Sequence, residues 1–154
     1  MVCLTRTPDD RRLYTLAGVG ILHLDRRSRS ATAQAGHRSW RIERTGLWRP
    51  VVAATGAGDT VVGEFRSAWA LGGGPLRWGD RELGLRAASW WHTRYALADG
   101  ERELATVEGT GLGKRPVSVT VDDLATIEPG LLLFAAFVVW GLVQDMMVAM
   151  SSIP

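Results

Sequence analysis

Cysteine and lysine are nearly absent from this chain of 154 residues: Cys3 is the only cysteine and Lys114 the only lysine. A single thiol cannot form an intrachain disulfide, so nothing in the sequence requires an oxidising compartment. The first twenty residues carry five charged side chains and no long apolar run, so we expect no secretory signal there. These features together predict a cytoplasmic protein.

The sequence also lacks the usual patterns of catalytic and metal sites. His23, His37 and His92 stand far apart and do not have the spacing of metal ligands. There is no G-x-S-x-G segment, and Cys3 at the chain terminus is a poor candidate for a nucleophile. We therefore expect a non-enzymatic protein with no catalytic residues, no metal and no cofactor.

One segment could still carry chemistry. Residues 55–63 (TGAGDTVVG) are similar to the GAGD signature of ribokinase-like sugar kinases. In those enzymes glycine amides stabilise phosphate charge and the aspartate accepts a proton, which would make Gly58-Asp59 the catalytic pair of a phosphotransferase. In the kinases, however, the motif opens a helix late in a longer chain, whereas residues 61–65 here have the pattern of a strand. A hairpin turn explains the same residues, and the kinase is the less favoured alternative.

What the sequence has in plenty is alternation of apolar and polar residues, the pattern of half-buried strands. It occurs at residues 31–35, 40–43, 82–87, 91–97 and 117–121. Turn-forming residues separate these stretches, at 25–28, 56–59, 72–75, 79–80, 99–100 and 109–111. Short strands at this spacing predict an antiparallel meander that closes into a barrel or a sandwich. No long linker interrupts them, so we expect one domain over residues 1–154.

The last quarter of the chain has a different character. Residues 131–143 (LLLFAAFVVWGLV) contain no polar side chain, Gln144 and Asp145 interrupt the run, and residues 146–150 are apolar again. Pro129 suits the first position of a helix, and Glu128 places negative charge at the positive end of its dipole. We expect a hydrophobic helix at 129–150.

A helix that is apolar on all sides lies either inside a protein or in a bilayer. An uninterrupted run of thirteen is short for a membrane span, which needs roughly 20 residues. No Lys or Arg follows Arg115, so neither flank has basic anchors. These observations favour a buried core helix. The alternative is a tail-anchored membrane protein with a small cytosolic β domain.

Three segments resemble the tubby C-terminal-like superfamily, which includes tubby, the phospholipid scramblases and the LURP-one-related proteins. They are residues 91–100 (WHTRYALADG), 103–108 (ELATVE) and 128–137 (EPGLLLFAAF). The resemblance implies a mostly β fold, an antiparallel barrel of hairpins that encloses a central hydrophobic C-terminal helix. It also implies a binding function directed at phosphoinositides or membrane lipid. It transfers no lipid-binding residue to this chain.

Charge is unevenly distributed along the chain. Residues 1–49 hold ten arginines and four acidic residues, whereas residues 50–154 hold eight basic and twelve acidic residues. The densest cluster is Arg26, Arg27 and Arg29, which we expect to project from a hairpin end. The cluster is either a solvated turn or a site for anionic lipid headgroups. A net charge of only +2 gives no strong signal for nucleic acid. The function expected is binding to an anionic membrane surface, peripheral to the membrane.

Overall fold

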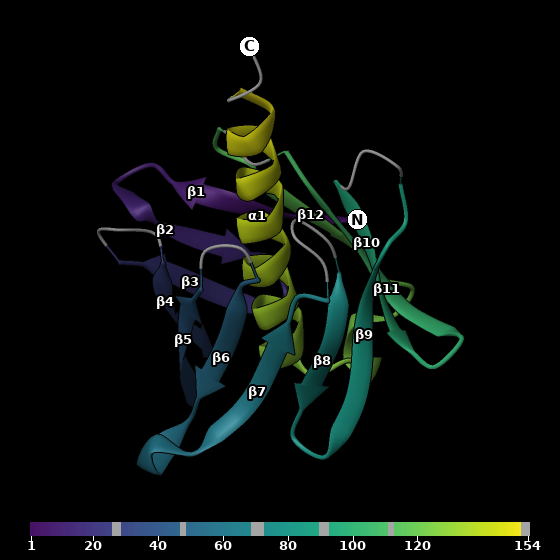
Figure 1. Ribbon diagram of the computed structural model, residues 1–154. Coiled ribbons are helices and arrows are strands. Elements are labelled where there is room, and N and C mark those ends of the chain that lie inside the picture. The colour runs from purple at the N-terminus through teal and green to yellow at the C-terminus, as the bar shows by residue number, and fades with distance from the viewer. Residues whose placement is uncertain (26–28, 47–48, 69–72, 90–92, 111–112, 152–154) are drawn as a thin grey trace.

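The computed structural model describes residues 1–25, 29–46, 49–68, 73–89, 93–110 and 113–151 (Figure 1). It shows an antiparallel β-barrel that surrounds one long helix. The strands are β1 (Val2–Thr7), β2 (Asp10–Leu16), β3 (Gly20–Leu24), β4 (Ser30–Ala35), β5 (Arg38–Thr45), β6 (Val51–Thr55), β7 (Val61–Arg66), β8 (Gly74–Trp78), β9 (Arg81–Ala87), β10 (Arg94–Asp99), β11 (Arg102–Gly109) and β12 (Val117–Thr120). The helix is α1 (Pro129–Ser151), and short 3₁₀ turns occupy Ala57–Asp59 and Leu124–Thr126.

Each strand pairs with the strand that follows it in sequence, and β12 pairs with β1 to close the barrel. Closure leaves no free edge strand, which removes a common site of aggregation. The fold predicted from the sequence, a barrel of antiparallel hairpins with a C-terminal helix inside, is confirmed.

The alternating residues of each strand divide between the two faces of the barrel wall. In β5, Trp40 and Ile42 are buried while Arg41 and Glu43 are exposed, and β3 follows the same rule. In β10 all four central residues, Tyr95–Ala98, are buried, so the alternation expected there is incomplete. Gly74 and Pro75, expected in a turn at 72–75, instead begin β8, and residue 72 lies outside the described residues.

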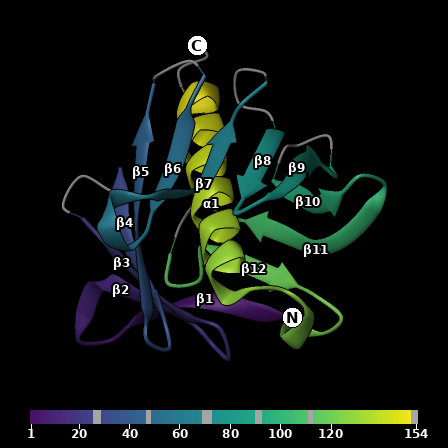
Figure 2. The same cartoon turned by 90° about the horizontal axis from the view of Figure 1, so that it is seen from below.

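The helix runs through the middle of the barrel, and the strands surround it (Figure 2). Residues 130–140, Leu142 and Val143 are all buried. An 18-residue window of α1 has a mean hydropathy of 2.0, which by length and composition would suit a membrane span. Within the barrel, 67% of that window is buried. The strands therefore supply the apolar surroundings that a bilayer would otherwise provide.

Aromatic contacts fix the start of the helix. The indole Nε1 of Trp78 donates to Glu128 Oε2 at 2.7 Å, immediately before Pro129. The Trp78 ring lies 5.6 Å from Phe134 and 5.9 Å from Trp40, measured between ring centroids. Such aromatic pairs add about 0.5–1.5 kcal/mol each beyond the area that they bury. Gly130 passes between the two tryptophans, where a Cβ atom would lie 2.7 Å from each ring.

Candidate functional site

The two ends of the barrel differ in charge, and each is named after the end of α1 that lies closer to it. At the start of α1, Glu128 contacts Trp78 near the end of β8; we call this the amino end of the barrel. At the other end, which we call the carboxyl end, Asp145 of α1 forms an ion pair with Arg44 near the end of β5. Because neighbouring strands are antiparallel, the connections between strands alternate between the two ends.

Basic residues gather at the carboxyl end. The connections there, counted with the strand residue on each side, hold six described basic residues, Arg29, Arg49, Arg66, Arg94, Lys114 and Arg115, all exposed. They hold three described acidic residues, Asp9, Asp10 and Asp25. We call these six basic residues the basic rim.

The amino end has the opposite balance. Its connections, counted in the same way and including the segment before α1, hold three basic residues, Arg38, Arg81 and Arg102. They hold seven acidic residues, Asp59, Asp80, Asp99, Glu101, Asp122, Asp123 and Glu128. The barrel is therefore polarised along the helix axis, with opposite charge at its two ends.

Within the part of the chain that the structure describes, most of the basic rim forms no ion pair. Arg66 Nε lies 2.5 Å from Glu64 Oε1, and Arg94 Nε lies 2.7 Å from Glu108 Oε2. For the other four, Arg29, Arg49, Lys114 and Arg115, no carboxylate of the described residues lies within 4.0 Å. Their charge is available to an external anion, and exposed arginines and lysines attract anionic surfaces over a Debye length of about 10 Å at 0.1 M salt.

Asp25, the acidic residue nearest to Arg29 in sequence, already has partners. It accepts hydrogen bonds from the Ser30 hydroxyl and, at 3.4 Å, from the guanidinium of Arg41. Arg41 also donates to Glu43 at 2.7 Å. The hydrogen bond and the charge of Glu43, followed by the charge of Asp25, raise the pKa of Arg41 above its ordinary value. The charges of these carboxylates are thus neutralised within the barrel wall, and the Arg29 side chain has no carboxylate partner among the described residues.

The sequence identified only part of the rim. Arg29 lies there as an exposed side chain, in the β3–β4 connection. Arg26 and Arg27, predicted with it, lie outside the described residues. Arg49, Lys114 and Arg115 were missed, because they contribute only one or two charges to a connection. Counting strands in order would have found them, since alternate connections must meet at the same end of a meander.

The end of α1 projects beyond the strands at this same end of the barrel (Figure 1). After Val143 the helix is no longer buried: Met146 and Met147 are half-buried, Val148 is 66% exposed and Met150 is 52% exposed. Few other large apolar side chains of the described residues are as exposed. The apolar tip of the helix, residues 146–150, therefore lies at the end of the barrel that carries the basic rim.

Arg44 fastens the helix just below this tip. Its guanidinium forms an ion pair with Asp145 and donates to the carbonyl oxygen of Gly141 at 3.5 Å. Only 17% of the Arg44 side chain is exposed, so this pair is shielded from water more than the surface pairs are. Asp145, the one ionic residue within the apolar helix, is thereby neutralised by a residue 101 positions away.

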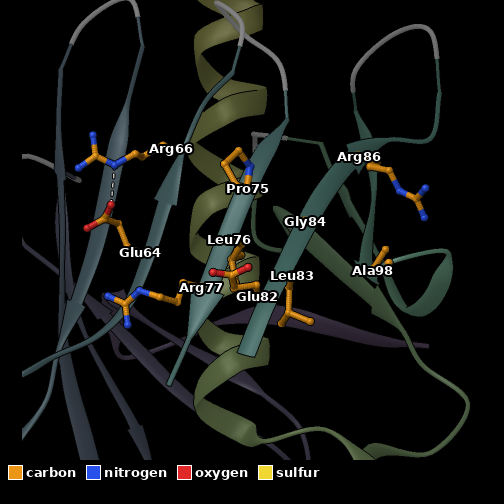
Figure 3. A pocket seen from close by; sticks show the side chains of 11 residues that line it. Glu64, Arg66, Pro75, Leu76, Arg77, Glu82, Leu83, Gly84, Arg86 and Ala98 are labelled. Carbon is orange, nitrogen blue, oxygen red and sulfur yellow. Dashed lines mark hydrogen bonds and ion pairs between the residues drawn. The ribbon is translucent and has the colours of Figure 1, made fainter. Parts of the chain in front are cut away.

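A hollow of about 540 Å³ lies on the outer surface of β7, β8 and β9, and Figure 3 shows its lining. Glu64, Arg77 and Glu82 are direct neighbours across the three strands. The guanidinium groups of Arg66 and Arg86 point away from its centre in Figure 3. The mixed charges of this lining favour neither an anion nor a cation, in contrast to the basic rim.

The residues with a resemblance to sugar kinases form a turn. Ala57–Asp59 is a three-residue 3₁₀ turn between β6 and β7, with Gly58 at φ 72° and Asp59 at φ 59°. Residues 61–66 form a strand, as the hairpin interpretation expects, and Asp59 is exposed at the amino end. Among the described residues, no group of three or more His, Cys, Asp or Glu side chains is placed to hold a metal ion.

Comparisons with protein-family models, with curated proteins and with solved structures found no match to this chain. The feature of the molecule that bears most on function is the contrast in charge between the two ends of the barrel.

Proposed function

We propose that this protein is a non-enzymatic, tubby-like binding domain that docks on anionic membrane surfaces through the basic rim. The observation that carries the proposal is the separation of charge between the two ends of the barrel. A molecule polarised in this way orients in the field of a negatively charged surface, with its basic end toward the lipid.

The size of the attraction is modest. Each basic residue close to an anionic leaflet contributes about 1 kcal/mol, and the contribution declines within a Debye length. The four rim residues that have no ion pair among the described residues therefore give reversible binding that weakens as the salt concentration rises. This behaviour is that of a peripheral protein in the cytoplasm, where anionic lipids face the protein.

The proposal is tested with vesicles. The protein should bind acidic phosphatidylserine vesicles at 0.1 M salt, bind neutral phosphatidylcholine vesicles far more weakly, and lose affinity as salt rises. Replacing Arg29, Lys114 and Arg115 by Ser should weaken binding to acidic vesicles about a hundredfold, because three contributions of about 1 kcal/mol are lost.

A matched control removes the same number of charges from the other end. The triple variant Arg38→Ser, Arg81→Ser, Arg102→Ser changes the net charge equally but should bind acidic vesicles as the unmodified protein does, or slightly better. Equal losses in the two triple variants, or equal binding of the unmodified protein to neutral and acidic vesicles, would refute docking through the basic rim. Cosedimentation measures both.

A further inference from the structure

We infer that the apolar tip of α1, residues 146–150, inserts end-on into the lipid surface that the basic rim contacts. The inference rests on the proposed function and adds to it a defined orientation, in which the helix axis lies closer to the membrane normal than to the membrane plane. Its partner is the boundary between headgroups and acyl chains, an environment that takes up apolar side chains.

The composition of the tip fits this environment. Its five residues, Met-Met-Val-Ala-Met, carry no charge, and the most exposed of its large side chains are Val148 and Met150. Asp145, the charged residue that directly precedes the tip, is already neutralised because it is paired with Arg44. The Ser151 hydroxyl donates to the Val148 carbonyl oxygen at 2.8 Å, so this polar group at the helix end is hydrogen-bonded within the protein.

The length of the tip limits how deep it reaches. At about 1.5 Å of rise per residue, five helical residues span about 7 Å, which matches the depth of about 5–10 Å reached by interfacial helices. Residues 130–143 of α1 are enclosed by the barrel, and Arg44 holds the helix at Asp145 just before the tip. The structure thus allows shallow insertion while the helix core stays in place.

The basic rim offsets an electrostatic repulsion that would oppose this insertion. The carboxyl terminus of a helix carries a partial negative charge, which an anionic surface repels. Arg29, Arg49, Lys114 and Arg115, which form no ion pair with a described residue, lie at the same end of the barrel and outweigh that partial charge. Charge attraction brings the barrel to the membrane, and the tip then adds contacts that salt does not screen.

The experiment places a reporter at the tip. In a Cys3→Ser background, a single cysteine is introduced at position 148 or, as the control, at position 61. Val61 is also an exposed valine, 44% accessible, but it begins β7 at the amino end of the barrel. Each cysteine is labelled with an environment-sensitive fluorophore, and phosphatidylserine vesicles are added. We expect the emission at position 148 alone to rise and to be quenched by labels on the acyl chains.

A second pair of variants measures the contribution to affinity. Val148→Asp should weaken binding to acidic vesicles about tenfold or more, whereas Val61→Asp should leave it within about twofold of the unmodified protein. Binding that persists with position 148 in water would overturn insertion but leave docking through the basic rim intact. Failure of the unmodified protein to bind acidic vesicles would overturn both. A dimer that Val148→Asp converts to a monomer would show that the tip joins two copies instead.

Discussion

At the scale of single residues, two glycines of α1 face the barrel wall in different surroundings. Gly130 lies between Trp40 and Trp78, where an added Cβ would be 2.7 Å from a carbon atom of each ring. Gly141 faces Arg44, where an added Cβ would be 3.1 Å from Nη1, the end of a flexible side chain. The first site is closed by rigid aromatic rings and the second by a movable group.

This difference predicts opposite results for the same substitution. Gly130→Ala should lower the free energy of unfolding by about 1–3 kcal/mol, because the tryptophans must shift in a packed core. Gly141→Ala should be neutral or slightly stabilising, because Arg44 can move and alanine favours a helix by up to about 1 kcal/mol. Urea unfolding monitored by Trp fluorescence measures both, and equal effects would contradict this view of the core.

At the scale of elements, α1 has two parts with separate roles. The part up to Val143 is the core of the barrel, and residues 146–150 are largely outside it. Ending the chain after Asp145 should therefore leave a folded barrel, with a loss of at most about 2 kcal/mol from the half-buried methionines. The shortened protein should lose the salt-resistant part of vesicle binding and keep the salt-sensitive part.

Deleting residues 131–154 should instead abolish folding. Each large buried side chain lost costs about 2–5 kcal/mol, and together they exceed a typical stability of about 5–15 kcal/mol. Far-ultraviolet circular dichroism on heating distinguishes the two truncations. A soluble protein of residues 1–130 with a cooperative thermal transition would show that α1 is not the core and would favour the tail anchor.

Much of this arrangement could be predicted from the sequence. Alternation located β4, β5, β9 and β12, and the apolar run located α1 to within a residue of its end. The closure of the barrel could not be predicted from local sequence patterns. It depends on pairs such as Val2 with Val119, which belong to the first and the last strand. The partner of Asp145 was equally hidden, since Arg44 is 101 residues away.

The candidate site was harder to predict, for a physical reason at the scale of the whole molecule. A local cluster such as residues 26–29 is visible in sequence, but the basic rim collects single charges from several connections. Only the alternation of strand direction brings Arg49, Arg94 and Arg115 to one end. The exposed tip of α1 was likewise indistinguishable from its buried part, because both are apolar.

At the scale of the whole molecule, the barrel encloses α1, and we propose that the protein meets membranes only through its carboxyl end. The most direct measurement is a salt wash of vesicle-bound protein. Residues 1–154 are purified without detergent and added to phosphatidylserine vesicles. The vesicles are then washed with 1 M salt, where the Debye length falls to about 3 Å. We predict a monomer that stays in solution alone, binds the vesicles at low salt and returns largely to solution in the wash. A protein that requires detergent, or whose Val148→Asp variant still remains with the vesicles after the wash, would contradict this prediction and identify α1 as a membrane anchor, because insertion of the tip explains only the salt-resistant binding that this variant should lose.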